Sequence, residues 1–349
     1  MRTRTFANRT LLTRLSLAAT SVVLAASATA CGANSPDTMS VMMDVGYLPK
    51  HTPFFAAVDH GFFAEEGLDV EVMPGSGSGN TVTAVESGRV DAGWADFAVT
   101  VINQGRGAKV KQVNLVQAQS AYAVVSMDGK GISTWDDLVG KTVATEGGGA
   151  MTSMWPYALS KLGLDKAAVN VVHAASNAKI PGLLAGQWDA NLALSVSDAP
   201  AVAGLGRTPV VLRWSDLGIN IYGNGIIFSD KEIASNPDRV KRFNRALQRG
   251  FLWACANKDS AAQSFHKEIE GYATSTVLTA LEEQCSLNWP KDYRDTPYGA
   301  MDDAGVQEVL DISRQFLGLK NRDLMPNQVY DNSFLSSITR DEQIVAPKA

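Results

Sequence analysis

The alternation of short apolar segments with helical segments along residues 41–194 is the feature that most constrains the fold. Strands joined by helices of this length form parallel sheets with helices on both faces. The expected strands are 41–47, 70–72, 90–94, 110–118, 121–127, 142–145, 169–173 and 190–194. The expected helices between them are 54–60, 81–87, 98–104, 152–162 and 180–185. The chain is therefore predicted to be an α/β protein.

The pattern occurs twice: a strand, a glycine-rich turn, a helix and a second strand, with a polar residue just beyond the strand end. We therefore predict two similar α/β lobes with mostly parallel sheets, joined by a hinge, over residues 41–124 and 125–221. In open α/β sheets the ligand lies beyond the carboxyl ends of the strands, which places a ligand cleft between the lobes. Residues 222–349 are expected to cross back and to form long helices, notably at 237–256 and 306–317, that pack mainly on the first lobe.

The N-terminus has the pattern of an export signal. Four arginines precede an apolar run at residues 15–26, and small residues then lead to Cys31. A cysteine directly after a small-x-small sequence resembles the lipobox of bacterial lipoproteins, which usually has Leu or Val where this chain has Ala28. We predict a signal peptide at 1–30, lipid attachment at Cys31, a tether at 31–40 and an extracytoplasmic protein anchored to the cell membrane. Ordinary secretion is the alternative. The apolar run is shorter than the roughly 20 residues of a membrane-spanning helix.

Composition and cysteine content fit a folded exported protein. Of the 349 residues, 45% are hydrophobic and 19% are charged, which allows a large core and excludes general disorder. The net charge is −5, and the part after the signal has no long run of Lys or Arg, so we expect no nucleic-acid partner. Cys255 and Cys285 are an even pair in an oxidising location, which predicts a disulfide, with two buried thiols as the alternative. Neither has a Cys or His at ligand spacing, so we expect no metal site. We also expect no cofactor.

Several motifs match a known family in order and spacing. Residues 46–49 are Gly-Tyr-Leu-Pro, residues 53–57 are Pro-Phe-Phe-Ala-Ala, and residues 61–70 are Gly-Phe-Phe-Ala-Glu-Glu-Gly-Leu-Asp-Val. Further matches lie at 84–93, 135–141, 183–190 and 236–240. Together they resemble the solute-binding proteins of ABC importers for nitrate, sulfonates, taurine and thiamine pyrimidine precursors. The resemblance implies a type II periplasmic-binding-protein fold, a monomer, and delivery of a small ligand to a membrane permease with its ATPase.

The candidate ligand contacts of the first lobe come from three turns. The first follows the opening strand and carries ring and hydroxyl groups. The second is a glycine-rich helix N-terminus, where backbone N–H groups can bind partly negative atoms. The third ends the strand at 90–94. The alternatives are a solvated histidine, a flexible connector and a core tryptophan. The candidates are His51, Thr52, Phe54, Ser76, Ser78, Asn80, Trp94, Asp96 and Phe97.

The second lobe repeats this arrangement, with a glycine turn at 146–153 and polar residues after the strand at 190–194. Each candidate has a loop or core position as its alternative. The candidates are Glu146, Met151, Thr152, Trp155, Asn177, Ser197, Asp198 and Tyr222. Three acids and no arginine in these turns favour a neutral or cationic ring, such as an aminopyrimidine, held by stacking, amine hydrogen bonds and cation–π attraction. The alternative is a small anion, namely a sulfonate, taurine or nitrate, bound by helix N-termini and hydroxyls.

Two other functions, an enzyme and a sensor subunit, are alternatives to transport. Some relatives of this fold synthesise the pyrimidine with a histidine and a lysine-bound cofactor, and His51 follows Lys50 here. The export signal places the chain away from that cofactor, and no Ser-His-Asp, metal-triad or nucleophilic-cysteine pattern is visible, so we predict a protein that is not an enzyme. The sequence does not distinguish a transport subunit from a sensor subunit that presents bound ligand to a receptor.

Overall fold

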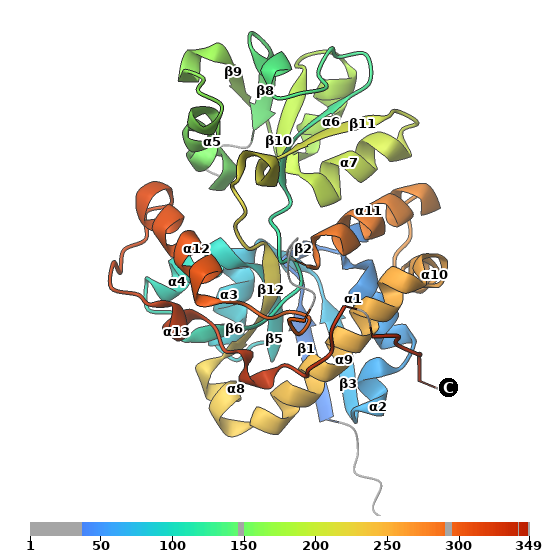
Figure 1. Cartoon of the computed structure of the whole chain (residues 1–349). Coiled ribbons are helices and arrows are strands. Elements are labelled where there is room, and N and C mark those ends of the chain that lie inside the picture. Colours follow the sequence, from blue (N-terminus) through green and yellow to red (C-terminus); the bar gives the residue numbers. More distant parts are fainter. Residues whose placement is uncertain (1–36, 146–149, 290–294, 341, 348–349) are drawn as a thin grey trace, which may run out of the picture. The chain divides into compact units, whose positions relative to one another are not determined.

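Two five-stranded mixed sheets organise the residues that the structure describes, which are 37–145, 150–289, 295–340 and 342–347 (Figure 1). The structure is a computed structural model. The predicted signal peptide, Cys31 and Glu146 lie outside the described residues. Each sheet with its helices is one lobe, so the predicted two-lobe α/β fold is confirmed.

The first lobe is built on a sheet of order β3-β1-β5-β12-β6. Strands β3, β1 and β5 are parallel, whereas β12 is antiparallel to both β5 and β6. Its strands are β1 (Asp37–Met42), β3 (Leu68–Met73), β5 (Ala92–Asp96), β6 (Val110–Leu115) and β12 (Asn224–Ser229), with a small pair β2 (Val45–Gly46) and β4 (Gly75–Ser76). Its first helices are η1 (Pro49–His51), α1 (Thr52–Asp59), α2 (Phe62–Glu65), α3 (Ser78–Glu86) and α4 (Phe97–Gln104).

The second lobe is built on a sheet of order β11-β7-β10-β8-β9. Strands β10, β8 and β9 are parallel, and β7 is antiparallel to both β10 and β11. Its strands are β7 (Tyr122–Met127), β8 (Thr142–Thr145), β9 (Asn170–His173), β10 (Ala190–Leu194) and β11 (Pro209–Arg213). Its helices are α5 (Ala150–Lys161), α6 (Ser176–Leu184), α7 (Ser195–Gly204), η2 (Asp136–Leu138), η3 (Lys166–Ala168) and η4 (Trp214–Leu217).

The sheets are more mixed than the expected mostly parallel arrangement, because the chain crosses between the lobes twice. The chain crosses at 116–121 and at 218–223. Each crossing enters the next sheet at the edge where the parallel strands of that sheet end. Asn224, the first residue of β12, pairs with Asp96, the last residue of β5. Tyr122, the first residue of β7, pairs with Leu194, the last residue of β10. Each returning strand must therefore run in the opposite direction to its neighbour.

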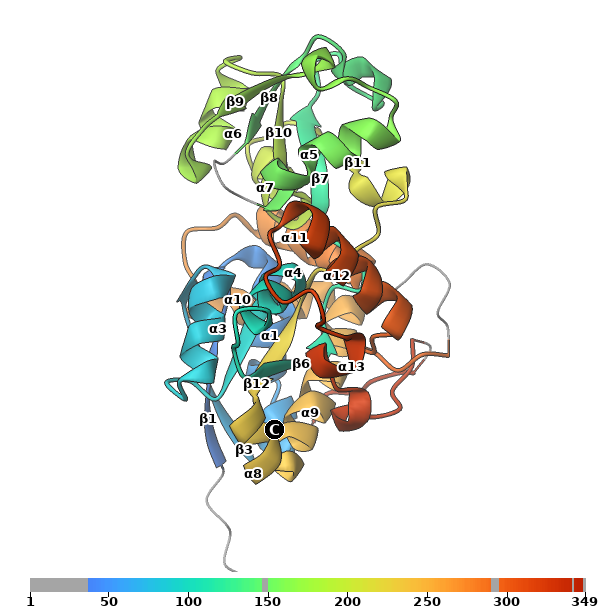
Figure 2. The same ribbon diagram turned by 90° about the vertical axis from the view of Figure 1, so that its left-hand side faces the viewer.

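The segment after the second crossing is mainly helical. Helix α9 packs against α1 and α2, and α12 packs against α4, so both cover the first lobe. Helix α11 contacts α7 of the second lobe as well as η1 of the first (Figure 2). The helices are α8 (Asp230–Ser235), α9 (Pro237–Ala256), α10 (Lys258–Glu268), α11 (Thr274–Leu287), α12 (Asp303–Phe316), α13 (Pro326–Val329) and η5 (Asn332–Phe334). No helix within the described ranges combines the length and the apolar character needed to cross a bilayer.

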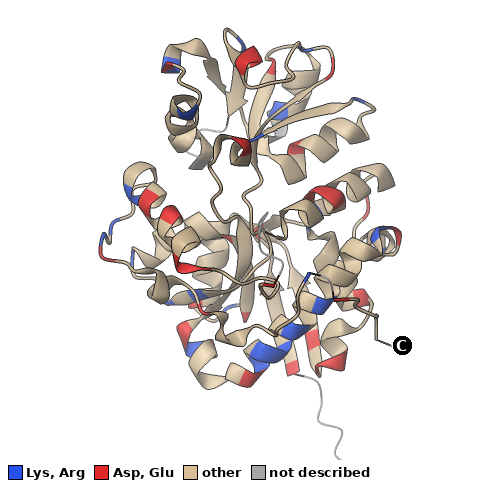
Figure 3. Ribbon diagram, viewed as in Figure 1, with Lys and Arg blue, Asp and Glu red and all other residues tan. Residues whose placement is uncertain are grey.

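Strand β1 begins at Asp37, inside the segment expected to be a tether, because long-range contacts fix it. It pairs along its whole length with β3, and Arg242 Nη2 of α9 donates to Asp37 Oδ2 at 2.5 Å. Arg249, on the same helix, pairs with Glu65, the last residue of α2, and Arg245 pairs with Glu66, which follows it. Figure 3 shows this basic stripe on α9 beside acidic residues of the N-terminal elements. The helix thereby fastens the first strand of the described part of the chain.

The predicted disulfide is confirmed. Cys255, near the end of α9, is bonded to Cys285 of α11, with 5.7 Å between the two Cα atoms. The bond therefore joins the helix that covers the first lobe to the helix that contacts both lobes.

Candidate functional site

A cavity of about 430 Å³ lies at the strand ends of both lobes. Asp96, Thr145 and Leu194 are the last residues of β5, β8 and β10, and all three line it. The first lobe contributes Asp44, Val45, Leu48, Lys50, Ser78, Asp96 and Asn224. The second lobe contributes Tyr122, Thr145, Met151, Thr152, Lys179, Leu192, Leu194, Ser197 and Asp198. This is the place at which ligands bind in open α/β sheets.

A buried ion-pair network forms one wall of the cavity around Asp44. Lys50 Nζ donates to Asp44 Oδ2 at 2.5 Å, and Asn224 Nδ2 donates to the same oxygen at 3.0 Å. The other oxygen, Oδ1, accepts from the backbone N–H of Val45 and from His51 Nε2, each at 2.9 Å. His51 Nδ1 accepts from the backbone N–H of Leu48 at 3.1 Å, which places the ring proton on Nε2. The carboxylate of Asp44 is therefore fully hydrogen-bonded.

The charges in this network are those of one carboxylate and one ammonium. Burial alone would raise the pKa of Asp44, but Lys50 and His51 more than offset it and hold the pKa well below its usual range. Burial lowers the pKa of His51 and outweighs the opposing effect of Asp44, so the imidazole is neutral at neutral pH. Asp44 and Lys50 thus neutralise each other at the cavity wall.

Asp96 is a second carboxylate at the cavity, and it differs from Asp44 in having no cationic partner. It caps α4, where its Oδ1 accepts from the backbone N–H of Val99 at 3.0 Å, and its own N–H donates to Ser78 Oγ at 3.1 Å. Burial raises the pKa of Asp96 to about 6; the Val99 N–H and the positive charge of Lys50 partly oppose this shift, and the charge of Asp44 adds to it. No Lys or Arg in the described ranges forms an ion pair with it.

The second lobe provides a second ion pair. Lys179 Nζ donates to the carbonyl oxygen of Leu192 at 2.9 Å and lies 3.6 Å from Asp198 Oδ2. Asn191 Nδ2 also donates to Asp198 Oδ2, at 3.1 Å. Asp198 is therefore compensated in charge, and Asp96 remains the uncompensated acid among the described residues that line the cavity.

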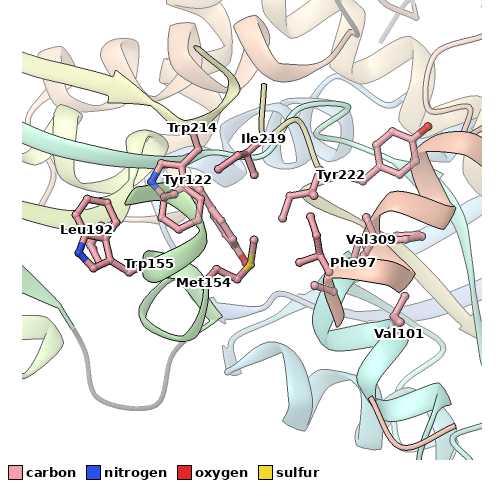
Figure 4. Close-up of a cluster of buried hydrophobic side chains, with 14 of the residues drawn as sticks. Phe97, Val101, Tyr122, Met154, Trp155, Leu192, Trp214, Ile219, Tyr222 and Val309 are labelled. Atoms are coloured by element: carbon pink, nitrogen blue, oxygen red, sulfur yellow. The ribbon is translucent and has the colours of Figure 1, made fainter. Parts of the chain in front are cut away.

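Tyr122 adds a phenol and an aromatic face. Its ring packs edge-to-face on Trp214, with 5.6 Å between the ring centroids (Figure 4). Burial raises the pKa of Tyr122 well above its ordinary value of 10, and the charge of Asp96 adds to this, so the phenol stays protonated. The remaining walls are largely aliphatic, with Leu48 on one lobe and Met151, Leu192 and Leu194 on the other. A flat ring could lie between these side chains while its edge meets the polar groups.

Comparison with known proteins identifies the family. Residues 48–261, more than half of the chain, match the family model described as "NMT1/THI5 like". The chain belongs to the NMT1/THI5-like family.

Relatives and structural neighbours of this chain have different activities. The chain is 23% identical over 215 residues to the 4-amino-5-hydroxymethyl-2-methylpyrimidine phosphate synthase of Schizosaccharomyces pombe, covering 58% of this chain and 62% of that protein. It is 22% identical to the formylaminopyrimidine-binding protein of Halalkalibacterium halodurans, covering 78% and 84%. The periplasmic aliphatic sulphonate-binding protein of Escherichia coli superposes with a TM-score of 0.67 at 14% identity, covering 86% and 99%. The chain thus spans less than two thirds of the length of the first of these relatives, and the last likeness shows the periplasmic-binding-protein fold.

In this NMT1/THI5-like chain, six of the candidate ligand residues line the cavity. All six have polar or flexible side chains and lie near strand ends or helix starts. The six residues are Ser78, Asp96, Met151, Thr152, Ser197 and Asp198. The side chain of Asn177 lies outside the described residues, as Glu146 does.

Five other polar candidates, Ser76 among them, lie beside the cavity wall or away from it. His51 is fully buried behind Asp44, which it helps to position. Thr52 is also buried, and its hydroxyl donates to the carbonyl oxygen of Pro49 at 2.6 Å. Asn80 Nδ2 donates to Ser76 Oγ at 3.1 Å at an exposed turn. The last candidate, Tyr222, accepts from the backbone N–H of Asp302 at 3.1 Å through its hydroxyl.

The aromatic candidates are core residues in the structure, not cavity residues. Trp94 is fully buried, with His51 on one side and Phe251 of α9 on the other, at centroid distances of 5.0 and 5.8 Å. Trp155 packs on Trp214, with 6.2 Å between centroids (Figure 4). Phe54 packs against Phe63 and Phe243, and Phe97 packs against Tyr222. The expected stacking of a ligand on Trp94 and Trp155 therefore needs correction, because other side chains already cover both rings.

Six polar residues of the cavity were not predicted from the sequence: Asp44, Lys50, Tyr122, Thr145, Lys179 and Asn224. One signal was available for Asp44, which follows the end of β1 just as Asp96 ends β5. The positions of Tyr122 and Asn224 depend on the antiparallel strands that return from each crossing. In the described ranges, no group of three or more His, Cys, Asp or Glu residues is arranged to hold a metal ion.

Proposed function

We propose that this chain is the extracytoplasmic solute-binding subunit of an ABC importer and that it closes around a small, neutral or cationic heterocycle of the aminopyrimidine class. A relative that binds formylaminopyrimidine and the fold shared with a periplasmic sulphonate-binding protein support a binding role. The export pattern and Cys31 support a lipid-anchored protein that delivers its ligand to a permease. Two acyl chains would give a stable attachment to the membrane.

The observation that carries the proposal is the charge balance of the cavity. Asp44 and Asp198 each form an ion pair with a lysine, whereas Asp96 forms none with the described residues and is affected by Lys50 only at longer range. An exocyclic amine or a protonated ring nitrogen of the ligand would supply the missing donor to Asp96. An anion in the same place would be repelled by Asp96 and would raise its pKa further. No arginine is among the described residues that line the cavity, which also disfavours an anion site.

The wall chemistry supports a flat ligand that is bound and released unchanged. Leu48, Leu192 and Leu194 offer apolar surfaces of the kind that cover a ring, and the protonated phenol of Tyr122 can donate to a ring nitrogen or carbonyl. Lys50 is engaged in a buried ion pair with Asp44. An ammonium has no lone pair with which to attack a carbonyl group, so this arrangement favours binding over catalysis.

Asp96→Asn should weaken binding of 4-amino-5-hydroxymethyl-2-methylpyrimidine, measured by titration calorimetry at pH 7.5, by about 1–3 kcal/mol. Asparagine keeps the shape and can still cap α4, so the variant removes the charge and little else. Asp216→Asn, which neutralises an exposed carboxylate of the second lobe outside the cavity, is the matched control. Equal affinity of Asp96→Asn and the wild type would contradict the proposal, as would a wild type that binds only sulfonates, taurine or nitrate.

The same variant should be more stable than the wild type at neutral pH in the absence of ligand. The pKa of Asp96 rises from 3.8 to about 6 on folding, so between these values the folded chain holds a proton that the unfolded chain has released. Its contribution is most favourable below pH 3.8 and declines as the pH rises through 6. We expect Asp96→Asn to gain roughly 1–2 kcal/mol at pH 7.5, after allowance for partial solvent exposure, and almost nothing at pH 4. Urea denaturation at the two pH values measures this; a gain that is the same at both would refute the role of the charge.

A further inference from the structure

Helix α11 contacts both walls of the cavity without lining it. It packs against η1, which carries Lys50, and against α7, which carries Ser197 and Asp198. No residue of α11 is among the described residues that line the cavity. The helix is therefore placed to couple the two lobes independently of the ligand.

One side of α11 is fixed to the first lobe and to the start of the first crossing. Cys285 is bonded to Cys255 of α9. The buried Gln284 donates through Nε2 to the carbonyl oxygen of Val116 and accepts at Oε1 from Gln117 Nε2, both at 2.8 Å. These bonds attach α11 to the first lobe and to the start of the first crossing.

The other side of α11 holds the second lobe through an ion pair. Arg213 Nη2, at the end of β11, donates to Glu283 Oε1 and Oε2 at 2.7 and 2.5 Å. Arg213 Nη1 donates to Ser195 Oγ, the first residue of α7, at 3.1 Å. The two charged side chains are 26% and 18% exposed, so the pair is partly shielded from water and is worth more than an exposed surface pair.

The apolar contacts around this pair are close. Ala121, Val196 and Leu287 form a buried cluster that joins the crossing, α7 and α11. Farther along, a Cβ atom on Gly204 of α7 would lie 2.1 Å from Thr276 Oγ1 of α11, so the approach of these helices requires glycine at this position. A larger side chain at 204 would separate the two helices without changing any charge.

We propose that Arg213 and Glu283 form a latch between the lobes and are positioning residues that set ligand affinity without touching the ligand. The latch favours the closed arrangement, in which both cavity walls face the ligand. A ligand that requires the closed arrangement binds with an affinity reduced by the fraction of molecules that are open. The ligand-free test of the latch is independent of the proposed function, whereas its effect on affinity rests on it.

The first test measures lobe separation without ligand. Spin labels on cysteines at Lys166 of the second lobe and Lys231 of the first, in a Cys31→Ser background, report the distance by pulsed electron resonance. Glu283→Gln, nearly isosteric, should shift or broaden the distribution relative to the wild type, and Arg213→Glu combined with Glu283→Arg should restore it. Arg207→Met removes an ion pair with Asp128 inside the second lobe and is the matched control, expected to have no effect. A Glu283→Gln distribution identical to that of the wild type would overturn the proposal.

The second test measures binding of 4-amino-5-hydroxymethyl-2-methylpyrimidine. Glu283→Gln should raise Kd about five- to tenfold, mainly through faster dissociation, with recovery in the charge-swapped pair. Gly204→Leu should have the same effect by a different route, and circular dichroism confirms that each variant is folded. An unchanged Kd beside an altered lobe distance would overturn the affinity role. If the wild type does not bind this probe, the proposed ligand class fails, and the distance experiment alone decides the latch.

Discussion

Asp44→Ala should reduce the free energy of unfolding by about 3–5 kcal/mol, because it leaves a buried ammonium without its counter-ion. Asp44 accepts four hydrogen bonds, and its partner Lys50 has a side chain that is only 1% exposed. In the variant, Lys50 must either lose its proton or draw water into the wall. Urea denaturation at pH 7 measures the loss.

Removing both charges separates the cost of an orphaned ammonium from the loss of contacts. Asp44→Asn combined with Lys50→Met should recover a large part of the stability lost in Asp44→Ala, since well-packed neutral groups can replace a buried ion pair. Asp128→Ala breaks an exposed pair with Arg207 and should cost far less, because water screens exposed pairs. A loss in Asp44→Ala as small as that of Asp128→Ala would show that the network contributes little. Because the pKa of Asp44 is held low, its contribution is present above pH 3.8 and is lost only as the pH falls through its lowered value.

Replacing both Cys255 and Cys285 with alanine should cost about 3–4 kcal/mol, the second large effect expected for this chain. The bond closes a loop with a sequence separation of 30, and the chain-entropy model gives this magnitude for a loop of that size. It also removes one of the attachments that hold α11 to the first lobe. Guanidinium denaturation of the variant and of the wild type, with and without reductant, measures the effect.

The wild type itself provides the control for the disulfide. Reduction should lower the denaturation midpoint of the wild type to that of the double alanine variant and should leave the variant unchanged. Thiol labelling of the unreduced, denatured chain should detect neither Cys255 nor Cys285. Full labelling of both, or equal midpoints for oxidised wild type and variant, would contradict the expected stabilisation.

Local sequence patterns determined most of the secondary structure and the division into two lobes. The expected strands at 142–145 and 190–194 and the helix at 237–256 have the same bounds in the structure. The cavity residues that could be predicted, such as Asp96 and Ser197, follow from the same information. Both are polar residues at or just beyond the end of an apolar strand, and the fold class places strand ends at the ligand.

Whether a side chain faces the core or the ligand was decided by tertiary packing. Trp94 and Asp96 are two residues apart on β5, so strand alternation gives them the same face. Phe251 of α9, more than 150 positions along the chain, covers Trp94. Asp96 lies at the last position of the strand, where it lines the cavity. No local pattern carries the information about which helix covers which part of a face.

Tyr122 and Asn224 also reach the cavity through contacts between segments that are distant in the sequence. Their segments are apolar and extended, and the sequence alone identified them as strands or crossings. Their places at the cavity come from register: Tyr122 pairs with Leu194, and Asn224 pairs with Asp96, residues 72 and 128 positions away. The sequence by itself determined most of the elements of residues 41–194, their order and the strand ends at which a ligand lies, but it did not predict α7, β11 or β12. The tertiary structure decided which side chains reach that ligand, because strand register and helix coverage depend on contacts between distant segments.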